Sequence, residues 1–127
     1  STRKPNKKIF DNVIFAFNVC RFVKSNAIVI TKNFSTIGIG SGQSSRVDSC
    51  DIAVNKMKRF ELDRGEDEIC AASDAFFPFT DGLEKLSVAG VTAVIQPSGS
   101  IKDRDIINLA NKLNLILIFS KTRHFKH

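Results

Sequence analysis

Three loops of this chain combine residue types that suit the binding of a flat, polar metabolite. The segment GIGSGQSSR (38–46) lets the backbone approach a ligand at its glycines and leads into a helix start, where an anion is favoured. SDAFFPFTD (73–81) is an aromatic loop, stiffened by proline, between the carboxylates Asp74 and Asp81. PSGS (97–100) has small residues whose backbone N–H groups can donate to a ligand. Because ligands of open α/β sheets bind beyond the carboxyl ends of the strands, we expect these loops to share one site.

Each loop also has an ordinary interpretation, and composition alone leaves both open. The first loop can be a plain tight turn, because its glycines lack the spacing of the dinucleotide-binding and P-loop motifs. The second can simply fill part of the apolar core, with Asp81 as the N-cap of the next helix. The third is more simply a strand-to-helix connection. The tail KTRHFKH (121–127) follows an apolar run and should emerge at the same sheet edge.

Cysteine and histidine usage argues against a metal centre. Cys20, Cys50 and Cys70 are widely spaced without a CxxC pair, which favours buried small hydrophobes over ligands or disulfides. His124 and His127 both lie in the last four residues, so a site that needs histidine must use the tail. We expect no metal.

The first half of the chain predicts a helix, a hairpin and a second helix. Apolar residues recur every three or four positions over 9–23, as on a helix with one buried face. Residues 27–31 and 36–39 are β-rich runs joined near Asn33, which tolerates a positive φ and favours a hairpin turn. The second helix begins after Ser44 or Ser45 as N-cap. Its expected buried side comprises Val47, Val54 and Met57.

The second half predicts three further strands and two helices. The expected strands are 69–72, 91–95 and 115–119, the last of them buried on both faces because it is continuously apolar. A helix over 81–89 should end at Gly90, and the final helix is indicated by the apolar positions Ile106, Leu109, Ala110 and Leu113. The order predicts one α/β domain over 1–127, a three-layer sandwich with a mixed five-stranded sheet.

Composition limits the classes of partner. The 127 residues are 43% hydrophobic and 25% charged, with no run long enough for a membrane span and no signal-peptide pattern, which favours the cytoplasm. The net charge of +6 suits nucleic acid or a phosphorylated metabolite. Stacking aromatics are not evident, because the chain has no Trp or Tyr and most of its 11 Phe lie in apolar runs. We therefore expect neither nucleic acid nor a membrane as partner, and keep a basic nucleic-acid binder as the least favoured alternative.

The segments SNAIV (25–29), TIGIGSGQSSRV (36–47), ASDAFFPFTDG (72–82), AGVTAVIQPSGS (89–100) and RHFKH (123–127) together resemble the closing segments of AICAR transformylase. They occur in that family's order and extend over nearly the whole chain. The chain is thus similar to the C-terminal portion of the bifunctional enzyme that is also an IMP cyclohydrolase. The resemblance implies a cytidine deaminase-like fold. Zinc deamination is disfavoured, because the H-x-E and P-C-x-x-C motifs are absent.

The resemblance also implies an activity and its ligands. The family transfers a formyl group from the cosubstrate 10-formyltetrahydrofolate to the nucleotide AICAR in purine (IMP) biosynthesis. The resemblance assigns AICAR contacts to Asn26, Arg46, the Phe76 backbone and Arg123. It assigns folate contacts to Val47, Asp81, Ser100 and Ile101. Amide groups suit a carboxamide, arginine suits a phosphate, and a carboxylate can accept from a pterin N–H.

The chain departs from the family pattern in what it lacks. The Lys-His pair of a KHANPCG-like motif and the cyclohydrolase domain are absent, so the proton transfer of general acid–base catalysis has no residue here. His127 is expected to have a supporting role at most, and the chain alone is expected to be inactive. Its expected partners are the rest of the transformylase and, in the full-length protein, a second subunit. The alternative is a non-catalytic nucleotide- or folate-binding remnant or interaction module.

Overall fold

The computed structural model describes residues 4–59, 68–75, 80–97 and 103–120. Helices and strands alternate after an N-terminal helix and hairpin, in the order that the sequence predicts. Their bounds are α1 Lys7–Cys20, β1 Ile28–Lys32, β2 Ser35–Gly40, α2 Arg46–Arg59, β3 Ile69–Ser73, α3 Asp81–Val88, β4 Val91–Pro97, α4 Asp103–Lys112 and β5 Ile116–Ser120. In this part of the chain no helix is long and apolar enough to cross a membrane.

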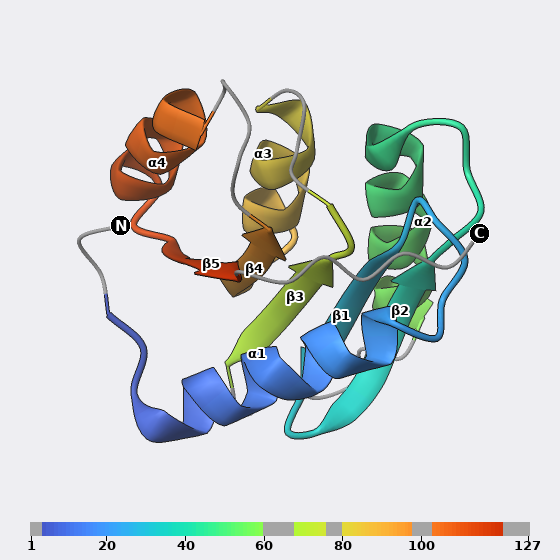
Figure 1. The fold of residues 1–127 in the computed structure, drawn as a ribbon, viewed down its shortest axis with the longest axis horizontal. Helices are drawn as coiled ribbons and strands as arrows, with labels where there is room; N and C mark the ends of the chain where they lie inside the picture. Colours follow the sequence, from blue (N-terminus) through green and yellow to red (C-terminus); the bar gives the residue numbers. More distant parts are fainter. Residues whose placement is uncertain (1–3, 60–67, 76–79, 98–102, 121–127) are drawn as a thin grey trace.

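The five strands form one mixed sheet in the order β2-β1-β3-β4-β5 (Figure 1). β1 pairs antiparallel with both β2 and β3, whereas β3, β4 and β5 run parallel. The register places Ile28 beside both Gly40 and Ser73. The start of β1, the end of β2 and the carboxyl ends of β3–β5 therefore meet at one edge of the sheet.

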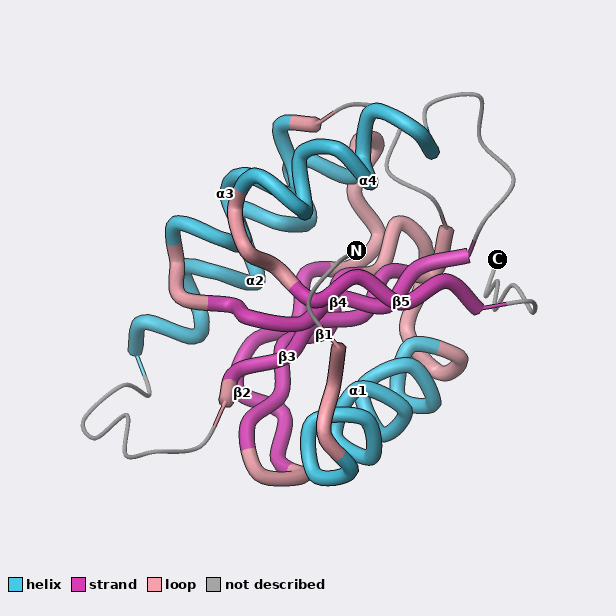
Figure 2. Tube along the Cα trace, turned by 90° about the vertical axis from the view of Figure 1, so that its left-hand side faces the viewer, coloured by secondary structure: helices cyan, strands magenta, loops and turns pink. Residues whose placement is uncertain are grey.

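Helices cover the two faces of the sheet unequally, as Figure 2 shows: α2, α3 and α4 lie on one face and α1 lies alone on the other. Each face has its own apolar core. The core on the three-helix side includes Ile28, Ile30 and Val94, and the core under α1 includes Val13, Val29 and Ile95. This confirms the three-layer α/β architecture.

Local signals at the turns behave as expected from the sequence. Asn33 (φ 51°) and Phe34 (φ 60°) both adopt the left-handed conformation that a two-residue hairpin turn requires. Gly90, just after α3, has a φ of 103°. Ser45 Oγ accepts from Asp48 N at 3.1 Å, which supports Ser45 as the cap of α2. α1 ends at Cys20, earlier than the apolar spacing to residue 23 predicts.

Two burial predictions are only partly right. Met57 of α2 is buried as expected and Val54 packs against the same core, but the buried side also comprises Ser49, Cys50 and Ala53, and Val47 is only half-buried. The cause is a close approach of α2 to β2: a Cβ at Gly40 would lie 1.9 Å from Ser49 O. β5 is buried on both faces only over its first part, where Ile116 and Leu117 belong to the two opposite cores, whereas Ile118 and Phe119 are partly exposed. The strand lies at the end of the described sheet and pairs with a strand on one side only.

Candidate functional site

Asn26, Arg46 and Asp74 form a polar cluster at the sheet edge where β1 begins and β3 ends. Arg46 is the first residue of α2, and Asp74 directly follows β3. One guanidinium nitrogen, Nη2, donates to Asn26 Oδ1 at 2.8 Å and to Asp74 Oδ1 at 2.7 Å. The pair is deeply placed, with 9% of the Arg46 side chain and none of the Asp74 side chain exposed. Charge-assisted bonds of this kind are the strong ones, so the three side chains hold one another in a fixed arrangement.

The glycine-rich loop holds Asn26 in place through the backbone. Asn26 Nδ2 donates to Gln43 O at 2.8 Å, and Ser49 Oγ donates to Asn26 O at 2.7 Å. Gly42 N donates to Lys24 O at 2.9 Å. These bonds tie the segment before β1 to the loop between β2 and α2. The loop therefore supports the position of Asn26 in the cluster.

Several buried polar atoms of the cluster have no hydrogen-bond partner within the described residues. They are Arg46 Nε, Asp74 Oδ2 and, on the residue before Asn26, Ser25 Oγ. Nε is a donor and Oδ2 is an acceptor, and they belong to the two members of one ion pair. Buried polar groups are nearly always satisfied, so this edge has unused capacity for a ligand that both donates and accepts.

Gln96 is a further unsatisfied group on the same edge. It lies near the end of β4 and is completely buried, and neither its Oε1 nor its Nε2 has a partner among the described residues. Val94, two residues earlier, belongs to the core under α2, α3 and α4, so strand alternation places the Gln96 side chain on that face. Sequence reasoning did not single out Gln96. A polar residue near the end of an apolar strand was the available signal.

Two of the four expected folate residues are described. Val47 lies in the first turn of α2 and Asp81 begins α3, with its side chain exposed. Asp81 lines an open groove of about 640 Å³ between these helices, and the Lys85–Asp51 ion pair, with N···O at 2.9 Å, also lies in it. Thr80, rather than Asp81, occupies the N-cap position of α3, and it makes no side-chain cap bond.

The other expected site residues lie outside the described residues. These are Phe76, Arg123, Ser100, Ile101 and His127. The grouping of Arg123 with Arg46 therefore stays a prediction. What sequence reasoning missed is the role of Asp74, which it treated only as one end of the aromatic loop. A carboxylate directly after a buried strand needs a cation, and that need was the available signal.

The three cysteines carry strongly raised thiol pKa values. All three are free and buried, and burial raises the pKa of the Cys50 thiol to about 12 and that of Cys70 to about 11. Burial also raises the pKa of Cys20 far above its ordinary value. Such thiols stay protonated and are poor nucleophiles or ligands. Within the described ranges, no three His, Cys, Asp or Glu side chains group as a metal site.

Solved structures with the same fold are deaminases. A dCMP deaminase from the cyanophage S-TIM5 superposes with a TM-score of 0.56 over 91% of this chain and 100% of its own, at 16% identity. A diaminohydroxyphosphoribosylaminopyrimidine deaminase/5-amino-6-(5-phosphoribosylamino)uracil reductase from Thermotoga maritima gives 0.50 at 11% identity, over 88% of this chain and 35% of its own. At these identities the similarity concerns the fold, which is that of the dCMP deaminases.

Sequence relatives share far more identity. The model of the AICARFT/IMPCHase bienzyme family matches residues 1–56. The bifunctional purine biosynthesis protein PurH of Buchnera aphidicola (subsp. Schizaphis graminum) is 46% identical over 100% of this chain, and that of Aquifex aeolicus is 47% identical over 98%. The chain spans about a quarter of the length of these relatives (24%). The chain is therefore similar over its whole length to a part of the bifunctional PurH proteins, and over residues 1–56 to the AICARFT/IMPCHase bienzyme family model.

Proposed function

We propose that this chain supplies part of a formyl-transfer site, in which AICAR accepts a formyl group from 10-formyltetrahydrofolate. The observation that carries the proposal is the Asn26–Arg46–Asp74 cluster. Two of its members are the residues that the resemblance assigns to AICAR, and they are hydrogen-bonded to each other at the expected sheet edge. The same cluster keeps a buried donor and a buried acceptor without partners.

The ion pair favours a particular part of the nucleotide. Because Asp74 already neutralises Arg46, the pair offers no net positive charge to a phosphate. Arg46 Nε and Asp74 Oδ2 together match a neutral group with one acceptor and one donor, such as a carboxamide. We assign the cluster to the base of AICAR and leave the phosphate to Arg123. Asn26 keeps one unused N–H and one lone pair for the same ligand.

The chain's contribution to the reaction is positional. Formyl transfer requires the amino nitrogen of AICAR to attack the formyl carbon, while the donor nitrogen of the folate leaves and takes up a proton. Holding both reactants in line supplies much of such a rate enhancement. The proton transfer needs a residue that the rest of the transformylase brings, so the isolated chain is expected to bind without turnover.

A chimera tests the proposal. This chain replaces the matching segment of the Aquifex aeolicus relative, and release of tetrahydrofolate is followed with AICAR and 10-formyltetrahydrofolate. The chimera should turn over and the isolated chain should not. Turnover by the isolated chain contradicts the assignment. AICAR binding without turnover in a folded chimera favours the second candidate, a non-catalytic remnant.

Variants of the cluster test whether Arg46 and Asp74 contribute to AICAR binding. Arg46→Gln combined with Asp74→Asn removes both charges, so no unpaired buried charge remains. The loss of a charge-assisted bond costs about 1.5–3 kcal/mol, which predicts a roughly ten- to hundredfold rise in the KM for AICAR. Arg59→Ala is the matched control, since Arg59 is the exposed last residue of the same helix, about 20 Å from Arg46. An unchanged KM in the double variant would contradict the assignment of the cluster.

A further inference from the structure

We propose that the side of α1 facing β2 is the surface on which the remaining polypeptide of the bienzyme docks, and that this contact fixes the segment carrying Asn26. The surface, which we name the α1 flank, consists of Phe15, Val19, Phe22, Phe34 and Ile39. The inference rests on the similarity to the longer PurH proteins and does not depend on the formyl-transfer assignment.

One helix cannot cover this face of the sheet. Five strands at about 4.8 Å spacing are about 20 Å across, whereas a helix with its side chains is about 10 Å wide. α1 packs against β1, β3 and β4. On the opposite face α2 lies directly over β2, but on the α1 side Ile39 of β2 stays only half-buried. Within the described part of the chain, the face beside α1 is therefore wide enough for one further segment.

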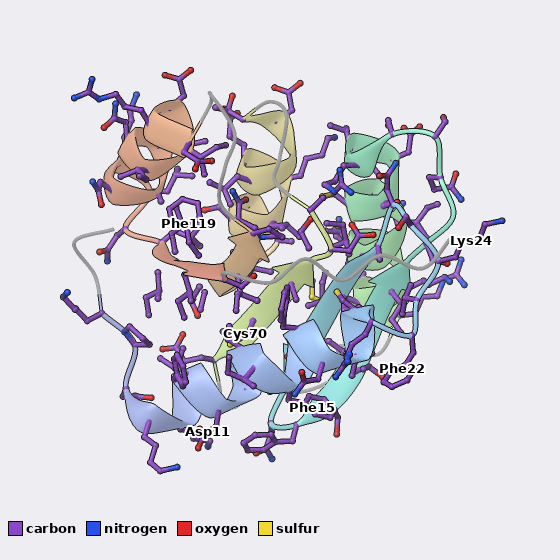
Figure 3. All side chains as sticks on the ribbon, viewed as in Figure 1. Asp11, Phe15, Phe22, Lys24, Cys70 and Phe119 are labelled. Carbon is purple, nitrogen blue, oxygen red and sulfur yellow. The ribbon has the colours of Figure 1, made fainter. Side chains whose placement is uncertain are left out.

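Aromatic side chains point into this space. Phe15, Val19 and Phe22 follow one another at spacings of four and three residues, so they form one stripe on the helical side of the segment. In Figure 3 Phe15 lies beside α1 near the hairpin turn, and Phe22 lies just past the end of α1. Phe22 is 77% exposed and Phe34 is 48% exposed. The rings of Phe15 and Phe34 meet edge to face at a centroid distance of 6.1 Å, so α1 and the hairpin turn present one aromatic pair.

Phe34, in the hairpin turn, adopts a backbone conformation that is unfavourable for an aromatic residue. Phe34 has a φ of 60°. This conformation suits glycine, which is the usual residue at the second position of an Asn-Gly turn. Its amide is held by Asn12 Oδ1 at 3.0 Å. Residues held in disfavoured conformations are concentrated at functional positions. A glycine would close this turn more favourably, and the ring of Phe34 instead contacts Phe15.

The length of the family's polypeptide identifies the occupant. This chain spans 24% of its relatives, so about three quarters of the bienzyme lies outside it. Arg21 and Lys24 are exposed on either side of Phe22. The segment that docks should accordingly be apolar at its centre and carry carboxylates at its rim.

The flank connects directly to the polar cluster. Phe22 and Asn26 lie in one short segment between α1 and β1, and Lys24 O accepts from Gly42 N within it. Covering Phe22 would hold the segment whose other end presents Asn26 to Arg46. Docking at the flank and geometry at the cluster are thus coupled through a few residues.

Thiol labelling tests the proposal. Phe22→Cys is introduced into the isolated chain and into the chimera with the Aquifex aeolicus relative, and the rate of maleimide labelling is measured. The native thiols are all buried and contribute little background. Labelling should be fast in the isolated chain and at least about tenfold slower in the chimera. Val88→Cys, at a position 90% exposed on α3, is the control and should label fast in both.

Three results would overturn the inference. Equal rates at Phe22→Cys in both proteins mean that the flank stays open. Slow labelling in the isolated chain that speeds up on dilution means that a second copy of this chain is the occupant. A second variant, Phe34→Gly, should stabilise the isolated chain and weaken the chimera, and stabilisation of both would show that the ring has no partner. Failure of formyl transfer in the chimera leaves these readouts unaffected.

Discussion

The Arg46–Asp74 pair should be strongly coupled, and a double-mutant cycle measures the coupling. Arg46→Met leaves the carboxylate of Asp74, which has no exposed surface, buried beside an apolar side chain. Removing one member of a buried pair typically costs about 3–5 kcal/mol. Since domains of this size are stable by about 5–15 kcal/mol, the single variant should lose a large fraction of its free energy of unfolding.

The double variant distinguishes desolvation from ordinary packing loss. Arg46→Met with Asp74→Asn removes both charges, and replacing a buried pair by neutral groups is often close to neutral. We expect it to lose at least about 2 kcal/mol less than the sum of the two single variants. Urea unfolding followed by circular dichroism gives the four free energies, provided that the dependence on urea stays similar.

A surface pair provides the control. Lys85 and Asp51 are also ion-paired, but their side chains are 41% and 47% exposed. Solvent screens such a pair, so Lys85→Ala should leave the free energy of unfolding almost unchanged. If Arg46→Met is as mild as Lys85→Ala, or if the two single losses simply add, the pair is not the structural centre of the site.

Three further outcomes follow from the packing and the titrating groups. Gly40→Ala should lower the free energy of unfolding by more than about 2 kcal/mol, because the new Cβ would meet the Ser49 carbonyl oxygen of α2 at 1.9 Å. Gly42→Ala should lower it by only about 1 kcal/mol, because the nearest side-chain atom is 3.7 Å away and only the φ of 66° is unfavourable. Gln96→Leu should raise the melting temperature of the isolated chain by about 3–6 °C, since it removes two unsatisfied buried groups, and an unchanged or lower value would mean that the amide is satisfied. Burial raises the pKa of Cys50 to about 12 and that of Cys70 to about 11, so the unfolded chain, with thiols near pKa 8.5, releases protons first. The free energy of unfolding should therefore be constant below about pH 8 and fall above it by up to about 1.4 kcal/mol per pH unit for each thiol. A free energy of unfolding that stays unchanged up to about pH 10 in urea titrations would contradict this.

Element order was predictable because each element carries a local signal. The spacing of apolar residues identified α1, and Asn33 identified the hairpin turn, where it has a φ of 51°. Strand order depends on contacts between distant residues. The continuous apolar run of β5 was therefore interpreted as fully covered, although the strand lies at the end of the described sheet.

The candidate site was predictable only in part, for a related reason. Asn26 and Arg46 came from the resemblance, and the structure brings them within hydrogen-bonding distance. The pairing of Arg46 with Asp74 joins residues of two separate elements, and no local pattern indicates it. The buried side of α2 was predicted at Met57 but not at Ser49 and Ala53, because it is selected by two glycines of β2, Gly38 and Gly40, over which the helix backbone lies.

The strand order β2-β1-β3 has a consequence for the way the chain is synthesised. β1 is a central strand that needs neighbours on both sides, but its second neighbour, β3, is encoded only after β2 and α2. At the usual ~5–20 residues per second, a ribosome takes several seconds to deliver β3 after β1 has emerged. During that interval the apolar segment Ile28–Lys32 has one unpaired edge, the kind of edge that recruits other chains. Nascent or truncated chains that end before β3 are therefore the species of this protein that we expect to aggregate and to need a chaperone.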